Sequence, residues 1–289
     1  MLYIPGIVDK FTVQQLLFLI AYLSIILFCL LANGSVCCAI VMWKKKKATS
    51  VPDNIFLFNL CMADIILCLS NIPAVLFYLL TKEWQFGWFL CKLTPMLQIS
   101  SVLAISFLLT CIALERCQNI ISLNRSSGLS RGQAWLIVSF LWSLAVALAF
   151  PSWLAAELKP LHPSLCGQFC LESGWNGAER RQLYGVALIA LQFAIPWVVM
   201  ASRYIVIFRK VKADLLMSRR RLNKTRSSKC VRKAAREPYK MKIQVMRTLF
   251  LMVALFGVCW LPLTVLNLLR DFKGDLAGKF LCGGEFLPF

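Results

Sequence analysis

A single carboxyl group interrupts one of the longest apolar stretches in this sequence. Asp64 is the only charged residue between Asn54 and Thr81. If this stretch lies in a membrane, an ionisable side chain there costs about 2.5–3.5 kcal/mol on insertion scales, so it is rarely kept without a use. We interpret Asp64 as a polar or ion-binding hub between helices, with Asn33 as its partner. The alternative is a protonated Asp64 that is held by a hydrogen bond and has only a structural role.

The residues that many enzymes use for catalysis are scarce. His162 is the only histidine in the chain, which leaves no histidine-based triad, zinc cluster or proton relay. No glycine-rich phosphate-binding loop is present either. We therefore expect no enzymatic activity, no cofactor and no metal site.

Six long apolar blocks are the elements that would position these side chains. The chain has 289 residues, of which 59% are apolar and 16% are charged, whereas a soluble domain has roughly 25% charged residues. Each block exceeds the roughly 18 residues of a membrane-spanning helix. Because no block alternates apolar with polar residues, we expect helices rather than barrel strands. The predicted spans cover about residues 11–43, 54–81, 91–117, 132–156, 182–209 and 241–270.

The first block contains 33 residues without a charge, from Phe11 to Trp43. It is longer than the roughly 7–15 apolar residues of a signal peptide, and we interpret it as a retained span.

The basic residues are concentrated in three segments. Of the 32 lysines and arginines, 22 lie at Lys44–Lys47, at Arg116, Arg125 and Arg131, and from Arg209 to Arg247. By the positive-inside rule these segments are cytoplasmic, so the N-terminus is expected to be extracellular. A face this basic suits anionic membrane lipids and acidic cytosolic partners. Nucleic acid is not expected as a partner, because Tyr239 is almost the only aromatic residue in the basic stretch.

Three cysteines lie in segments that this topology places outside, where thiols are oxidised. Cys91 is at the outer end of the third span, and Cys166 and Cys170 lie between spans four and five. We expect Cys91 to form a disulfide with one of these two, which is worth roughly 2–4 kcal/mol of stability. The remaining cysteine is either free or paired with Cys282, which is also predicted to be external.

The spacing of several residues resembles that of rhodopsin-class G-protein-coupled receptors. Asp64 follows Leu60-Cys-Met-Ala, and the pair Glu115-Arg116 ends the third span, with Arg116 25 residues after Cys91. The other matching residues are Asn33-Gly34, Trp142, Pro196 with Tyr204, Phe256, and Cys259-Trp260-Leu261-Pro262. The resemblance implies an all-α, polytopic bundle of the rhodopsin-like type, which forms one domain over residues 1–289.

Within that class the sequence is similar to the neuropeptide Y and pancreatic polypeptide receptors. The residues that carry this similarity are Trp84-Gln-Phe86-Gly87 before Cys91-Lys92, Glu115-Arg-Cys-Gln118, Cys170-Leu-Glu-Ser173, and Trp260-Leu-Pro-Leu-Thr-Val-Leu-Asn267 with Asp271. The resemblance implies a plasma-membrane receptor whose ligand is an amidated peptide hormone or neuropeptide and whose cytosolic partner is a heterotrimeric G protein. Such an architecture also admits a receptor oligomer. By the same resemblance, Cys170 rather than Cys166 is bonded to Cys91.

The resemblance also assigns a ligand site. In that family the amidated Arg-Tyr tail of the peptide is bound by polar residues low in the pocket and by an acid at its rim. The matching residues are Gln98, Gln192 and Asn267, the acidic Asp271, and Tyr78 near the top of span two. Amide side chains can donate and accept hydrogen bonds, and a carboxylate can pair with an arginine through two bonds. Taken singly, the three amides could instead connect helices, and Asp271 could be an ordinary loop charge.

A second set of residues matches the activation switch and the G-protein contact of the family. By the resemblance, Glu115 and Arg116 form the charge pair that gates the G-protein contact. Tyr204 and the basic end of span six, including Arg247, line the same cytoplasmic cleft. The bistable element would be Phe256 and Trp260 beside the helix kink at Pro262.

The sequence departs from the family in three places. Ile105 stands where the family supplies a serine to a sodium site near Asp64, which argues against sodium binding there. Cys117 replaces the aromatic or histidine residue that follows the Glu-Arg pair. The Asn-Pro-x-x-Tyr segment of a seventh span is absent, and residues 280–289 resemble only the start of that span.

We therefore expect a receptor that transmits the binding of an amidated neuropeptide Y-type peptide to cytosolic G proteins. The absent seventh-span segment supports an alternative, a truncated non-signalling product that at most modulates full-length receptors. A receptor for another amidated peptide is a further interpretation. A small-solute transporter is disfavoured, because the two halves show no internal repeat.

Overall fold

The computed structural model describes most of the first five predicted spans and part of the sixth. The described residues are 13–43, 51–81, 83–121, 129–160, 167–224, 244, 247, 250, 251, 254, 255, 257–262, 264–266 and 269. The predicted start of a seventh span, residues 280–289, lies outside them.

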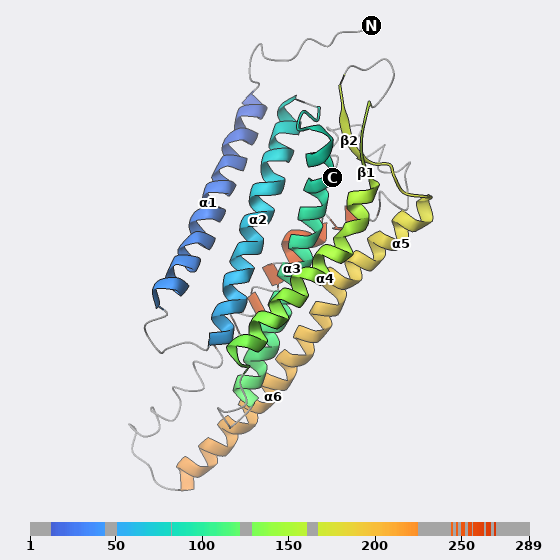
Figure 1. Ribbon diagram of the computed structural model, residues 1–289. Coiled ribbons are helices and arrows are strands. Elements are labelled where there is room, and N and C mark those ends of the chain that lie inside the picture. The colour runs from blue at the N-terminus through green and yellow to red at the C-terminus, as the bar shows by residue number, and fades with distance from the viewer. Residues whose placement is uncertain are drawn as a thin grey trace.

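Long helices run side by side to form the bundle (Figure 1). Their bounds are α1 Val13–Trp43, α2 Val51–Thr81, α3 Gly87–Ile121 and α4 Arg131–Ala155, followed by α5 Ala178–Ile189, the π-helix η2 Ala190–Ala194 and α6 Ile195–Lys224. The last three are consecutive and form one continuous rod, the fifth span. By length and composition, five helices among the described residues can cross a membrane, which agrees with the first five predicted spans.

Helices α3 and α6 extend beyond the predicted spans, and the extension of α6 runs through charged residues. α3 starts at Gly87, whereas the predicted span starts at residue 91. α6 continues to Lys224, whereas the predicted span ends at residue 209. Lys, Arg, Leu and Met are good helix formers, so the helix continues beyond the apolar segment. Figure 1 shows α6 extending past the neighbouring ends of the other helices. The described residues from Gln244 to Leu269 are also helical, as predicted for span six.

Local sequence accounts for the beginning of α4. The hydroxyl of Ser130 accepts a hydrogen bond from the backbone N–H of Gln133, and the Gln133 side chain accepts one from the backbone of Ser130. This capping box satisfies two backbone N–H groups that a helix start leaves without partners.

A short antiparallel hairpin adds to the all-helical prediction. Strand β1, Ala156–Lys159, pairs with β2, Phe169–Glu172, so that Ala156 is opposite Glu172 and Leu158 is opposite Cys170. The hairpin lies between α4 and α5 at one end of the bundle (Figure 1). We call this end the hairpin end, and the opposite end, where α6 carries Arg209 and Lys212, the basic end.

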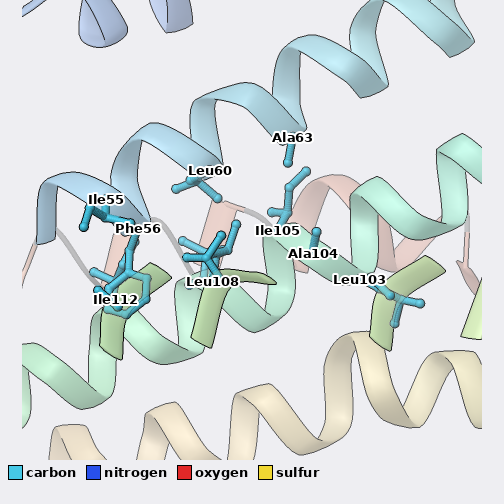
Figure 2. Packing of buried hydrophobic residues seen from close by; sticks show 13 residues of the cluster. Ile55, Phe56, Leu60, Ala63, Leu103, Ala104, Ile105, Leu108 and Ile112 are labelled. Atoms are coloured by element: carbon cyan, nitrogen blue, oxygen red, sulfur yellow. The ribbon is translucent and has the colours of Figure 1, made fainter. Parts of the chain in front are cut away.

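The centre of the bundle is α3, which packs against α2, α4 and α6, while α1 packs against α2. Figure 2 shows Phe56, Leu60 and Ala63 of α2 pointing toward Ile105, Leu108 and Ile112 of α3. By contrast, α1 leaves large apolar side chains such as Leu17 and Phe28 exposed. Such exposure suits contact with lipid, which is as apolar as these side chains.

Candidate functional site

The hairpin is covalently attached to the central helix. Cys91, in the first turns of α3, is bonded to Cys170 of β2, and the two Cα atoms are 5.5 Å apart. The predicted choice of Cys170 is therefore confirmed, while Cys166 and Cys282 lie outside the described residues. Because the bond joins residues 79 positions apart, it holds the hairpin over the end of α3.

Trp84 connects the hairpin to the turn between α2 and α3. Its backbone N–H donates to the Gln168 carbonyl at 2.7 Å, and its indole N–H donates to the Gly87 carbonyl at 2.9 Å. Gly87 has φ 76°, a backbone conformation that favours glycine. The indole packs in one buried cluster with the disulfide and with Ala74 and Ala156. The Trp84-Gln-Phe86-Gly87 motif thus forms the seat of the disulfide.

The hairpin end also carries a partly exposed carboxylate. Glu157 of β1 forms an ion pair with Lys159 and accepts a hydrogen bond from the Ser173 hydroxyl. The bond from Lys159, which has the larger effect, and the bond from Ser173 hold the pKa of the Glu157 carboxyl below its usual range. The carboxylate therefore stays ionised at neutral pH and contributes a charge at the rim of the bundle.

Three of the predicted ligand residues lie in described helices. Tyr78 of α2 is 8% exposed, and Gln192 in η2 is 9% exposed. Gln98 is half-buried on α3. Asn267 and Asp271 lie outside the described residues. Since Ala74, one turn before Tyr78, packs against the disulfide cluster, Tyr78 belongs to the hairpin end.

The Glu115-Arg116 pair lies toward the basic end of α3. Glu115 is 5% exposed, and Arg116 is half-buried. The adjacent Cys117 thiol lies 4.0 Å from the Arg203 carbonyl of α6. A small thiol at this position therefore lets α3 and α6 approach closely beside the charge pair.

Two aromatic contacts connect the fifth and sixth spans. The ring centroids of Tyr204 and Phe250 are 5.8 Å apart. A Cβ atom added to Gly257 would overlap Cζ2 of Trp197. The indole thus lies directly against the sixth helix where Gly257 has no side chain. Arg247, which the resemblance places beside Tyr204 at the cytoplasmic cleft, is exposed.

The predicted switch residues of span six are described in part. Trp260 is half-buried, and its carbonyl accepts a hydrogen bond from the Thr264 hydroxyl at 2.8 Å. Pro262 is exposed, and Phe256 lies outside the described residues. The switch role of this segment stays a prediction.

Asn33 and Asp64 make no direct hydrogen bond to each other, and the polar hub stays a prediction. The Asn33 amide donates instead to the Cys29 carbonyl of its own helix at 3.1 Å, because a short amide side chain reaches the preceding turn easily. Helices α1 and α2 are connected here by the Cys29 thiol, which lies 3.7 Å from the Asp64 backbone carbonyl. Asp64 itself is half-buried.

One polar contact was missed by sequence reasoning. The Ser106 hydroxyl of α3 donates to the carbonyl of Gln192 in η2, and both residues are buried. A signal for it exists in the sequence, because Pro196 is four residues after Gln192 and removes the helical donor to that carbonyl. Which side chain supplies a donor in its place is a tertiary property.

A comparison with protein families decides what kind of bundle this is. The family model "7 transmembrane receptor (rhodopsin family)" matches residues 32–281. The chain belongs to this family. The family consists of membrane receptors rather than enzymes, and the receptor is accordingly a multi-pass membrane protein with a helical bundle.

Several neuropeptide receptors are similar to this rhodopsin-family receptor. Neuropeptide Y receptor type 6 of Mus musculus is 30% identical over 271 residues, which is 90% of this chain and 69% of the mouse protein. The QRFP-like peptide receptor of Branchiostoma floridae is 30% identical over 89% of this chain and 65% of its own length. The neuropeptide F receptor of Drosophila melanogaster is 30% identical over 87% of this chain and 52% of its own length. The alignments therefore cover between 52% and 69% of the length of these relatives.

Proposed function

We propose that this receptor binds a neuropeptide Y-type peptide with an amidated Arg-Tyr end and transmits that binding to a G protein. The observation that carries the proposal is the disulfide between Cys91 and Cys170, which holds the hairpin beside the ends of α2 and α3. The similar proteins named for neuropeptide Y, QRFP-like peptide and neuropeptide F support a peptide as the ligand class.

The polar residues suit the chemistry of such a peptide tail. Gln98 and Gln192 provide amides that can donate to and accept from a carboxamide and a phenol. Asn267 and Tyr78 complete this set, and Asp271 pairs with the peptide arginine. Burial of Gln192 and Tyr78 strengthens such bonds, because little water competes for them.

The hairpin end is the extracellular end in this proposal. Disulfides persist in oxidising compartments, and the Cys91–Cys170 bond lies at that end. The basic residues of α6, including Arg209 and Lys212, lie toward the opposite end, as the positive-inside rule requires of a cytoplasmic face. The N-terminus is then extracellular and the receptor lies in the plasma membrane.

Signalling follows as a shift between two arrangements of the helices. A peptide that binds one arrangement more tightly increases its population by the difference in affinity. The contacts that must rearrange at the basic end are those between α3, α6 and span six, at Cys117–Arg203 and Tyr204–Phe250. Arg116 and Arg247 border this region and would contact the G protein.

The proposal is tested by peptide binding to the intact chain. The chain, with an N-terminal epitope tag, is expressed in cells, and binding of a radiolabelled peptide that ends in Arg-Tyr-amide is measured at the surface. Asp271→Ala is expected to weaken binding by at least tenfold, since it leaves the peptide arginine without its partner. Gln98→Ala and Gln192→Ala should each reduce affinity by about tenfold, as one lost buried hydrogen bond does.

Asp275→Ala is the matched control, because it removes an equal charge four residues away. Its affinity should equal that of the parent chain. A second arm measures nucleotide exchange on a purified G protein with and without the peptide. A chain that reaches the surface but shows no saturable peptide binding would contradict the proposal.

A further inference from the structure

The fifth span contains a π-helical turn immediately before a proline. Residues Ala190–Ala194 form η2, and the N–H of Ile195 bonds to the carbonyl of Ala190, five residues earlier. Pro196 has no N–H group, so it cannot make the α-helical bond to the carbonyl of Gln192. The proline ring also crowds that carbonyl. A π-turn at this position gives the carbonyl room to turn out of the helix.

A carbonyl that is turned out inside a membrane protein needs another donor. An unsatisfied backbone group in the apolar interior is costly, because no water is available to bond it. The Ser106 hydroxyl of α3 supplies the bond to Gln192. Ser106 is 1% exposed, and the apolar residues Ile105 and Leu109 near it along α3 are also buried.

Ser106 behaves differently from several other serines and threonines in the described helices. Ser24, Ser100, Thr110 and Ser152 each donate to a carbonyl three or four residues earlier in their own helix. That is the usual arrangement for serine and threonine in helices. The Ser106 hydroxyl instead bonds to a different helix, 86 positions along the chain.

The bonded carbonyl belongs to a residue of the proposed peptide site. A π-turn inserts one residue, which rotates everything before it by about 100° relative to an uninterrupted α-helix. The direction of the Gln192 side chain and of α5 therefore depends on the π-turn. We propose that Ser106 is a positioning residue, whose hydroxyl stabilises the π-turn at Pro196 and thereby holds Gln192 in its binding orientation. We call the stabilisation of the π-turn by Ser106 the geometric part of the proposal, and it is argued from the structure alone. The effect on peptide binding rests on the proposed function.

The first experiment tests the geometric part and needs no ligand. The thermal unfolding midpoint of the purified chain is measured for the parent, Ser106→Ala, Pro196→Ala and the double variant. Loss of one buried hydrogen bond should lower the midpoint by about 3 °C or more in Ser106→Ala. In the Pro196→Ala background the N–H of residue 196 can bond to the Gln192 carbonyl, so the same serine change should have less than about half that effect.

The second experiment measures affinity for the radiolabelled Arg-Tyr-amide peptide. Ser106→Ala should weaken binding about tenfold, the change expected for one displaced hydrogen-bond partner. In the Gln192→Ala background the serine change should cost less than about twofold, because the side chain to be positioned is gone. A purely structural defect would reduce the number of binding sites equally in both backgrounds and leave affinity unchanged.

Ser100→Ala is the matched control, since Ser100 is equally buried on α3 but donates within its own helix. It should alter affinity by less than about twofold. If Ser106→Ala does not fold, Ser106→Cys, which keeps the size and a weak donor, replaces it in both cycles.

Equal losses of unfolding midpoint in the parent and Pro196→Ala backgrounds would overturn the geometric part. Equal losses of affinity with and without Gln192 would overturn the positioning role. If the parent chain binds no peptide, the proposed function fails while the unfolding cycle still decides the geometric part.

Discussion

At the scale of single residues, the disulfide between Cys91 and Cys170 connects two parts of the chain that are far apart in sequence. It closes a loop of 79 residues between α3 and the hairpin. Cross-linking such distant residues restricts the unfolded chain strongly, so its loss should be felt by the whole bundle. The buried cluster around it, with Trp84 and Ala156, depends on the same bond.

Replacing both cysteines, Cys91→Ala with Cys170→Ala, should lower the free energy of unfolding by about 2–4 kcal/mol. The measurement is thermal unfolding of the purified chain with and without dithiothreitol. Reductant should lower the midpoint of the parent and leave that of the double variant unchanged. Cys38→Ala is the control, because Cys38 is an exposed free thiol of α1. A parent midpoint that reductant does not change would contradict the prediction.

At the scale of elements, the fifth and sixth spans approach each other through one glycine. The indole of Trp197 occupies the space that a side chain at residue 257 would need. Small residues allow close helix contacts in membranes, where packing rather than the hydrophobic effect drives association. This contact and the Tyr204–Phe250 pair determine how span six lies against α6, which is part of the fifth span.

Gly257→Ala should therefore destabilise the chain by about 1–3 kcal/mol, since the added methyl group meets Trp197. Gly34→Ala in α1 is the matched control, because nothing lies within 4 Å of a Cβ atom there. That change should be neutral or stabilising by about 0.5–1 kcal/mol. Both are measured as unfolding midpoints in the same detergent. In a Trp197→Ala background the glycine change should lose its effect, and equal midpoints for Gly257→Ala and the parent would argue against the contact.

At the scale of the whole molecule, charge and disulfide chemistry are divided between the two ends of the bundle. The disulfide, Lys159 and Glu157 lie at the hairpin end. Lys212 lies on the extension of α6 at the basic end. The proposed orientation makes the first end extracellular and the second cytoplasmic.

This orientation predicts the accessibility of two engineered thiols. Lys159→Cys should react with a membrane-impermeant maleimide on intact cells, whereas Lys212→Cys should react only after the cells are permeabilised. Both positions are exposed in the structure, so burial does not explain a difference. The parent chain, with its own cysteines, gives the background. The opposite labelling pattern would reverse the orientation.

The sequence alone determined the membrane-spanning architecture of this protein. A helix in hydrocarbon must satisfy its own backbone over about 20 apolar residues, so span positions are a local property that can be counted. The first five spans agree with described helices. The choice of Cys170 came from the resemblance, whereas topology alone left Cys166 as an equal candidate.

Only the tertiary structure decided which groups contact each other across helices. Asn33 bonds within its own helix rather than to Asp64. Gln192 lies in a π-turn whose carbonyl accepts a bond from Ser106, and Gly257 lies against Trp197. Each of these contacts depends on helix rotation and on distances between residues far apart in the chain. Apolar length places a helix in the membrane, but side-chain packing and backbone hydrogen bonds choose its rotation and its neighbours.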